Sequence, residues 1–279
     1  NGYPFRSGWT LFDDEVTDSG VYFSSEKEIR NNIPMQGTFY GIGVGPGDCD
    51  LLTLKAVKAL AQADIIAVPE SSREAGSTAY DIARPHLKEN VEILSLEFPM
   101  IRDVAQREQF RRNNAHRVAE QLNQGKHVAF LTLGDPMLYS TYLYLLEYLQ
   151  QDGVTPVSIP GVYSFTAISN MLNLPLVKGD ENMAVVCAID EENWQTYQTF
   201  STLVLMKVSA YAPLLHKLLS ETPDWDFCMV TNAGKPSEVV SFDHNDLENG
   251  VHYFSTVILK RKGTATSVPP VAMSASHNL

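Results

Sequence analysis

Residues 38–63 read TFYGIGVGPGDCDLLTLKAVKALAQA, and this stretch predicts one strand, a glycine-rich loop and one helix. An apolar strand over Thr38–Val44 runs into the loop Gly41–Asp48. Helical spacing over Leu52–Ala63 predicts one apolar face, and Thr53 or Asp50 is available as the N-cap. The residues expected on that face are Leu54, Val57, Leu60 and Ala61. A strand, loop and helix in this order are typical of an α/β fold.

The same alternation continues as far as Lys260. Further predicted strands are Asp64–Pro69, Val91–Leu96, His127–Leu133, Val157–Ile159, Met183–Cys187, Thr202–Lys207, Phe227–Thr231 and Tyr253–Lys260, the last of them antiparallel to its neighbour. Further predicted helices are Ser77–His86, Asp103–Gln124, Leu138–Gln150, Ser164–Leu172, Glu191–Phe200 and Ala212–Ser220. The order predicts a mostly parallel sheet covered by helices. The expected fold class is α/β, with two α/β domains and a ligand cleft between them.

Changes in composition divide the chain into four parts. Residues 1–36 are an expected N-terminal extension, because the acidic and polar stretch that ends at Pro34 shows no periodicity. Residues 37–152 are the expected N-terminal α/β domain, and residues 153–262 the expected C-terminal α/β domain. The tail 263–279 is rich in Ser, Thr, Pro and Ala and is expected to be disordered.

The bulk composition excludes several classes of protein. A net charge of −12 argues against a nucleic-acid partner, which requires a basic surface. No apolar run reaches the length of a membrane span, so no membrane partner is expected. Three widely spaced cysteines argue against a disulfide framework and favour a cytoplasmic location. Seven scattered histidines lack ligand spacing, so no metal site is expected.

Three loops at predicted strand ends are candidates for a binding site. The loop Gly41–Asp48 does not match a dinucleotide fingerprint, because Pro46 stands where that pattern needs a glycine and has no N–H. It does not match a Walker loop either, because no Gly-Lys-Ser/Thr follows. The second loop, Thr132–Thr141, and the third, Ile159–Phe165, each contain an ordinary turn sequence. Taken singly, each loop is explained as well by a tight turn or a helix cap as by a ligand site.

Taken together and in order, the three loops resemble the tetrapyrrole (corrin/porphyrin) methylase family. The shared pattern is Gly-x-Gly-Pro-Gly-Asp, then Gly-Asp-Pro, then Pro-Gly-Val-x-Ser. Within that family, GVGPGDCDLLTLKAVK at Gly43–Lys58, TLGDPMLYST at Thr132–Thr141 and LPLVKGDE at Leu174–Glu181 resemble the members that methylate carbon 20 of precorrin-2 or cobalt-factor II. The resemblance covers about residues 37–262 and neither end of the chain.

The resemblance implies an enzyme of corrin synthesis that uses S-adenosylmethionine as methyl donor, a tetrapyrrole as substrate and a homodimeric assembly. It places the methyl donor in the cleft between two domains. Carried over by position, the cofactor-binding residues are Pro46, Leu133, Gly134, Asp135, Leu138, Tyr163, Ser164, Met206 and Ala233.

The candidate catalytic residues are Asp135 and Tyr139. Methyl transfer to an electron-rich carbon needs mainly alignment and exclusion of water, so a base is helpful rather than essential. The alternative interpretation, with equal weight, is an aspartate that caps the turn and a tyrosine at the edge of the core.

The substrate's carboxylates require local positive charge in an acidic protein. Arg73, Arg84, His86, Lys88 and Arg102 cluster in loops of the first domain, and Arg73 and Arg84 are the expected substrate-binding residues. A second group, Arg107, Arg111, Arg112 and Arg117, repeats near helical spacing and is interpreted as a solvated helix face.

Two other functions remain open on the sequence. One is a different tetrapyrrole-methylase activity, on another corrin carbon, on uroporphyrinogen III, or on a protein or rRNA target. The other is a noncatalytic nucleotide-binding module with Gly41–Asp48 as its sensor. Binding of S-adenosylmethionine in preference to ATP or NAD would distinguish a methylase from such a nucleotide-binding module.

Overall fold

The computed structural model describes residues 37–69, 73–99 and 101–264, and for residues 73–77 the backbone alone. These residues belong to one compact unit, Met35–Leu279. The predicted extension, residues 1–36, lies outside the described residues, as does nearly all of the predicted disordered tail.

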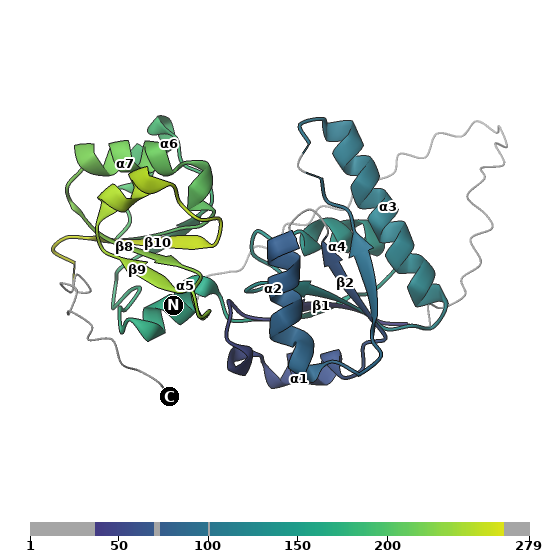
Figure 1. Ribbon diagram of the computed structural model, residues 1–279. Helices are drawn as coiled ribbons and strands as arrows, with labels where there is room; N and C mark the ends of the chain where they lie inside the picture. Colours follow the sequence, from purple (N-terminus) through teal and green to yellow (C-terminus); the bar gives the residue numbers. More distant parts are fainter. Residues whose placement is uncertain (1–36, 70–72, 100, 265–279) are drawn as a thin grey trace, which may run out of the picture. The chain divides into compact units, whose positions relative to one another are not determined.

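The first sheet has five strands, all parallel, in the order β3-β2-β4-β1-β5 (Figure 1). Its strands are β1 Phe39–Gly43, β2 Ile65–Pro69, β3 Glu92–Leu96, β4 Val128–Thr132 and β5 Val157–Ile159. Its helices are α1 Leu54–Leu60, α2 Arg73–Ala83, α3 Val104–Asn123 and α4 Tyr142–Gln151. Short 3-10 helices η1 Cys49–Leu51 and η2 Arg84–His86 follow β1 and α2.

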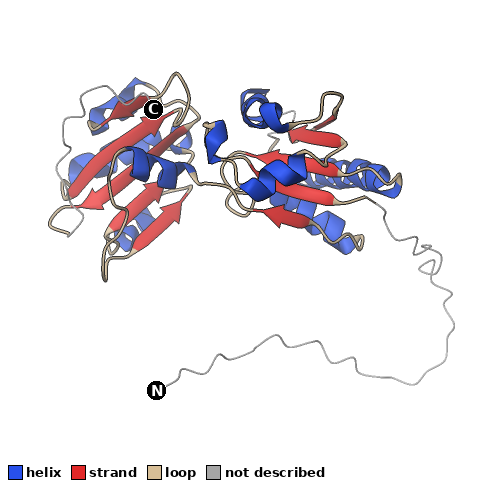
Figure 2. Cartoon of the chain, turned by 90° about the horizontal axis from the view of Figure 1, so that it is seen from below, coloured by secondary structure: helices blue, strands red, loops and turns tan. Residues whose placement is uncertain are grey.

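Alternate residues of the central strands supply two separate apolar layers, because successive side chains of a strand point to opposite faces. Along β4, Val128 and Phe130 pack with α3 and α4, whereas Ala129 and Leu131 pack with α1 and α2. The parallel sheet is therefore covered by helices on both faces, as the alternating sequence predicts (Figure 2).

One tyrosine of α4 reaches across the first sheet. Tyr142 is fully buried, and its hydroxyl lies 2.7 Å from the Ser158 hydroxyl in β5. A Cβ atom at Gly41 in β1 would lie 2.2 Å from the Tyr142 ring. Glycine at this position of the strand thus leaves room for the ring to pass over β1 and join α4 to the edge strand.

The second sheet has five strands of mixed direction, in the order β6-β7-β10-β8-β9. Its strands are β6 Met183–Val186, β7 Thr202–Leu205, β8 Trp225–Thr231, β9 Val239–Ser241 and β10 Ser255–Arg261. The helix α5 Ser164–Met171 precedes β6, and the helices between the strands are α6 Glu191–Tyr197, α7 Ala212–Glu221, and the 3-10 helices η3 Val208–Ala210 and η4 His244–Asn249. As expected, β10 is antiparallel to its neighbours. Residues of α5 pack on one face, and residues of α6 and α7 on the other.

The structure differs from the predicted elements in three respects. The strand at Val157–Ile159 forms, but it pairs with β1 in the first sheet, not with the second domain to which the sequence analysis assigns it. A division at residue 152 therefore separates β5 from its own sheet. In α1, Leu54 is 80% exposed, and the buried positions are Ala56, Ala59 and Leu60. The short strand β9 has no counterpart in the prediction.

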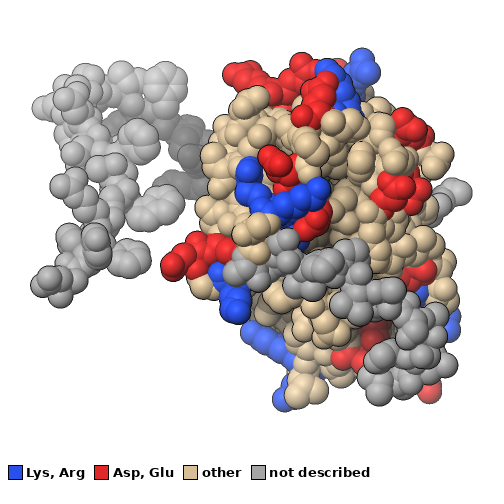
Figure 3. All heavy atoms as spheres, turned by 90° about the vertical axis from the view of Figure 1, so that its left-hand side faces the viewer, with Lys and Arg blue, Asp and Glu red and all other residues tan. Residues whose placement is uncertain are grey.

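The described surface carries many acidic side chains, as expected from the net charge of −12 (Figure 3). Figure 3 shows Asp and Glu side chains in several groups over one face, with Lys and Arg between them. Among the described residues, no helix combines the length and the apolar character that a membrane crossing requires.

Candidate functional site

The three loops singled out in the sequence meet at the carboxyl ends of β1, β4 and β5. Gly43, Gly134 and Gly161, one from each loop, touch through their backbones. A Cβ atom on Gly161 would lie 2.0 Å from the Gly134 carbonyl oxygen, and one on Gly43 would lie 2.5 Å from the Gly161 nitrogen. A side chain at either position would separate the loops. The three motifs are thus one structural unit at the edge where parallel sheets bind ligands.

The glycines of the first loop serve mainly this packing. The structure places Gly43 and Gly47 against other backbone segments. A Cβ atom on Gly47 would lie 2.6 Å from the Ala233 carbonyl oxygen. The N–H groups of Val44 and Gly45 donate to the carbonyls of Thr132 and Gly134. Gly45 has a positive φ of 77°, a backbone conformation that glycine adopts readily.

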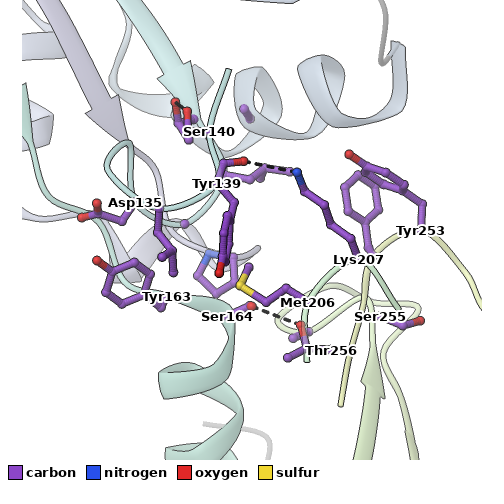
Figure 4. A pocket seen from close by; sticks show the side chains of 18 of the residues that line it. Asp135, Tyr139, Ser140, Tyr163, Ser164, Met206, Lys207, Tyr253, Ser255 and Thr256 are labelled. Carbon is purple, nitrogen blue, oxygen red and sulfur yellow. Dashed lines mark hydrogen bonds between the residues drawn. The ribbon is translucent and has the colours of Figure 1, made fainter. Parts of the chain in front are cut away.

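A cavity of about 240 Å³, here called the loop cavity, lies at this junction. All nine residues that the sequence analysis assigns to the methyl donor line it: Pro46, Leu133, Gly134, Asp135, Leu138, Tyr163, Ser164, Met206 and Ala233. Figure 4 shows the side chains of Tyr139 and Met206 pointing toward each other, and the Tyr163 hydroxyl pointing toward Asp135. Residues next to strands of both sheets therefore contribute to one site.

Asp135 is the one carboxylate among the described residues that line the loop cavity, and it is engaged on both oxygens. Oδ1 accepts the Met137 N–H at 2.8 Å and Oδ2 accepts the Gly161 N–H at 3.0 Å. The side chain belongs to a residue that is 7% exposed. Asp135 thus caps its own turn and ties the second loop to the third, which is the alternative that the sequence left open.

Tyr139 also lines the cavity, in an unusual backbone conformation. Its φ is 52°, and its hydroxyl donates to the Val185 carbonyl at 2.9 Å. Burial raises the pKa of the phenol above its ordinary value, and the Cys187 thiol adds to this shift. Because the neutral phenol is favoured and already donates a hydrogen bond, the geometry favours a structural donor over a catalytic base. Burial and the neighbouring Asp135 likewise raise the pKa of Tyr163.

Left-handed backbone conformations of non-glycine residues concentrate around this cavity. Within the described chain four such residues occur, and three of them, Tyr139, Lys207 and Asn232, line it. A residue with a side chain is strained in this region by about 1–3 kcal/mol, and such strain is common at functional sites. Of these three residues, Tyr139 is the one predicted as a catalytic candidate. Asn232 precedes the turn at Gly234, and asparagine before a glycine turn is a signal that was available in the sequence.

Of the two expected substrate arginines, Arg84 is described and does not line the loop cavity. Arg84 begins η2 and is exposed, whereas Ala79 in the preceding helix reaches the lining. The backbone of Arg73 begins α2, and its side chain is outside the described part. The cations that line the cavity are Lys207 and Lys235. Lys207 Nζ lies 3.5 Å from the Tyr139 carbonyl oxygen (Figure 4). Lys235 Nζ lies 3.8 Å from the centre of the Phe254 ring.

A further group of lining residues was missed because it lies far away in the sequence. These residues precede or begin β10: Tyr253, Phe254, Ser255 and Thr256. The Ser164 and Thr256 hydroxyls are 3.2 Å apart, which connects the start of α5 to β10. No motif marks this segment, because its part in the site depends on the folding of the second sheet.

Other candidate chemistry is limited in the described part of the chain. The three cysteines are not in disulfides. Asp48, Cys49 and Asp50 lie close enough together to share a metal ion, but their hydrogen bonds are those of the turn at η1, where Asp48 accepts the Asp50 N–H. The absence of a metal remains a prediction.

Comparison with known proteins identifies the family. The family model of the Tetrapyrrole (Corrin/Porphyrin) Methylases matches residues 38–244. The cobalt-precorrin-2 C(20)-methyltransferase of Salmonella typhimurium is 32% identical over 234 residues, which is 82% of this chain and 98% of that protein. A probable cobalt-precorrin-2 C(20)-methyltransferase of Methanocaldococcus jannaschii is 34% identical over 227 residues, 80% of this chain and 95% of that protein.

Solved structures show the same fold. The uroporphyrin-III C-methyl transferase of Thermus thermophilus, solved with S-adenosylhomocysteine, has a TM-score of 0.60 and 21% identity, and the alignment covers 80% of this chain and 97% of that one. The family match extends over most of the chain, and it includes all three loops that meet at the loop cavity. The chain therefore belongs to the tetrapyrrole (corrin/porphyrin) methylases.

Proposed function

We propose that this protein transfers a methyl group from S-adenosylmethionine to carbon 20 of precorrin-2 or of its cobalt-containing form. The observation that carries the proposal is the loop cavity, in which all nine residues expected to hold the methyl donor come together. The names of the two relatives support carbon 20 as the target. A relative of the same fold that was solved with S-adenosylhomocysteine supports the choice of methyl donor.

The lining of the loop cavity fits S-adenosylmethionine. Leu133, Leu138, Met206 and Ala233 provide an apolar wall for an uncharged adenine. Asp135 supplies negative charge near a sulfonium, and Lys207 and Lys235 supply positive charge for a methionine carboxylate. An apolar cavity with a few directed polar groups is typical of small-molecule sites.

A nucleotide-binding module is less well supported by the same loop. A phosphate cradle needs several backbone N–H groups that point at the ligand. In the first loop, Val44 and Gly45 already donate to the carbonyls of Thr132 and Gly134, and Pro46 has no N–H. The loop therefore has few donors to offer a phosphate.

When bound, S-adenosylmethionine supplies a methyl group made electrophilic by its sulfonium. The residues of this chain position the reactants and exclude water. Asp135 fixes the second loop against the third, so the walls on either side of Gly134 keep a constant spacing. The apolar side chains of Leu133, Leu138 and Met206 keep water from the methyl group. Catalysis then rests on alignment, which is worth several kcal/mol when reacting atoms are held in contact.

A strong base is not required by this arrangement. Asp135 accepts two backbone hydrogen bonds, and Tyr139 has a raised pKa and is itself a donor. Both residues are therefore proposed to position the loops, and the proton on the methylated carbon is proposed to leave to solvent after transfer.

The test combines binding and transfer. Calorimetry should detect S-adenosylmethionine or S-adenosylhomocysteine, with no preference for ATP or NAD. Incubation with precorrin-2 and with cobalt-factor II, using a ¹³C-labelled methyl donor, should place one labelled methyl at carbon 20 by NMR. No binding of either sulfur ligand at millimolar concentration would exclude the methylase function, and label at another carbon would leave the donor site correct and the target wrong.

We also propose a cytoplasmic homodimer. The resemblance to paired family members supports the dimer. Two of the described cysteines, Cys49 and Cys187, are partly exposed and unpaired, which suits a reducing compartment. Light scattering at micromolar concentration should give twice the chain mass, and a monomeric mass would contradict the dimer.

A further inference from the structure

A second cavity of about 430 Å³ adjoins the loop cavity. The two share Pro69, Thr141, Lys207 and Tyr253 as lining residues. Figure 4 shows Lys207 and Tyr253 beside one another at the side of the loop cavity. A ligand that occupies the second cavity can therefore extend toward whatever is bound in the first.

The lining of the second cavity is basic and aromatic. Three arginines from the start of α3 and the residues before it, Arg102, Arg107 and Arg111, join Lys207 there, and we call this cavity the arginine pocket. None of the described lining residues carries a carboxylate. The rings of Phe98, Phe110, Tyr144 and Tyr253 form the remainder of the wall. In a chain of net charge −12, such a concentration of cations needs an explanation.

The positive charge is only partly neutralised within the protein. Arg111 pairs with Glu108, and its guanidinium carbon lies 3.5 Å from the centre of the Tyr144 ring. Glu108 also accepts the Tyr148 hydroxyl. Arg102 and Arg107 take part in no ion pair among the described residues. Among the described residues, Glu108 is the one carboxylate that forms an ion pair with an arginine of this pocket.

Arg107 has an unsatisfied donor. Its Nε is buried and has no hydrogen-bond partner within the described structure. A buried donor without a partner costs about 1–3 kcal/mol, and more if the group is charged. Arg107 also lines the arginine pocket, so a ligand there can supply acceptors to the other N–H groups of this guanidinium. The guanidinium fork is well suited to a carboxylate.

We propose that the arginine pocket binds carboxylate side chains at the periphery of the tetrapyrrole, with Arg107 as the central contact. The aromatic walls receive part of the macrocycle, and Lys207 marks the boundary with the methyl donor. The proposal rests on the proposed function, because it identifies where the substrate of that reaction is held. It replaces Arg84 of the sequence analysis and reverses the interpretation of Arg107 and Arg111 as a solvated helix face.

The test compares Arg107→Gln with Arg112→Gln. Both remove one positive charge from α3, but Arg112 is exposed and does not line the pocket. Arg107→Gln should raise the KM for the tetrapyrrole about ten- to a hundredfold and leave the affinity for S-adenosylhomocysteine within twofold, because one charge-assisted contact is lost. Arg112→Gln should change neither quantity by more than about twofold. Arg107→Lys should recover part of the loss, since charge is kept but the fork is not.

A second measurement separates this proposal from the proposed function. Uroporphyrin, a porphyrin with a carboxylate on every peripheral side chain, serves as a probe whose fluorescence polarisation reports binding without any methyl transfer. Weaker uroporphyrin binding by Arg107→Gln than by Arg112→Gln would support the pocket even if no methyl reached carbon 20. Equal KM values and equal probe binding in both variants, with normal methylation by the wild type, would overturn the pocket and leave the function intact.

Discussion

The loop cavity and the arginine pocket adjoin each other but are built by different means. The first is formed by backbone turns in which Gly43, Gly134 and Gly161 touch without side chains between them. The second is formed by long side chains of Arg107 and Arg111 on one helix. Glycine turns leave a pattern in the sequence, because few other residues fit them. Arginines on a helix leave no such pattern, because most of them are simply solvated.

The largest effect is expected at the glycine contact. Gly161→Ala would place its Cβ atom 2.0 Å from the Gly134 carbonyl oxygen, so the loops must separate. We expect the free energy of unfolding to fall by about 3 kcal/mol or more, and binding of S-adenosylhomocysteine to be lost. Chemical denaturation and calorimetry measure the two quantities.

Gly153→Ala is the matched control for that change. Gly153 has a φ of 82° and open space around its Cβ position. The alanine substitution there therefore costs only the strain of a left-handed backbone conformation. This strain is about 1–2 kcal/mol, and ligand affinity should be unchanged. Equal losses in the two variants would show that the contact among the three glycines is not special.

Asp135→Asn should give the next largest effect. An amide has one acceptor oxygen, so it cannot accept from both Met137 and Gly161, and its NH₂ group would face one of these donors. We expect a loss of about 1–3 kcal/mol in stability, with weaker binding of S-adenosylhomocysteine. An unchanged affinity together with a kcat lowered more than a hundredfold would assign Asp135 to the chemistry instead of to the loop junction.

Salt should separate the two cavities without any mutation. Raising the ionic strength from about 0.05 M to about 0.5 M shortens the screening length several-fold. The KM for the tetrapyrrole should then rise several-fold, because the arginine pocket attracts carboxylates. The affinity for the methyl donor should change by less than about twofold, because the loop cavity holds it largely by apolar contacts. Steady-state kinetics measures the KM and calorimetry measures the affinity for the methyl donor. An equal response of the two to salt would contradict the difference between the cavities.

The smallest effect is expected for Tyr139→Phe. The variant loses one neutral hydrogen bond to Val185, a net cost of about 1 kcal/mol. Because the pKa of Tyr139 is raised, its neutral form is favoured by folding. The contribution is present below the unfolded pKa near 10 and is lost as the pH rises through the folded value. We therefore expect kcat to fall less than tenfold and to be flat between about pH 7 and pH 9. A rate that climbs with pH in the wild type and is abolished in the variant would identify a base.

The sequence predicts the elements well and their environment less well. Every predicted strand and helix has a counterpart, and Thr53 caps α1 by accepting the Ala56 N–H. The buried face of α1 was misplaced because Leu54 is the more hydrophobic residue, whereas the residues that fit beneath the helix are Ala56 and Ala59. Close packing of a helix on a sheet can favour small side chains over large ones, which hydrophobicity alone does not indicate.

Site residues that belong to a short sequence motif could be predicted, and those brought in by long-range contacts could not. Residues next to strand ends, such as Gly134 and Tyr163, line the loop cavity because motif and position coincide, and their contact with the methyl donor stays a prediction. Arg84 lines neither cavity, because the sequence does not indicate the direction in which a basic side chain near a strand end points. Tyr253 and Thr256 belong to the site through the pairing of β10 with β7 and β8, and such long-range pairing cannot be read from a single segment.

Tyr142, whose ring passes over β1, affects the local stability of the edge strand β5. The strand β5 has only three residues and pairs on one side, so on its own it would exchange its amide hydrogens rapidly. The bond between Tyr142 and Ser158 fastens it to α4, whose core residues are fully buried. The amides of β5 should therefore exchange at the same rate as those of α4. The third loop begins where β5 ends, so its local stability should depend on α4, to which the Tyr142–Ser158 hydrogen bond connects that strand.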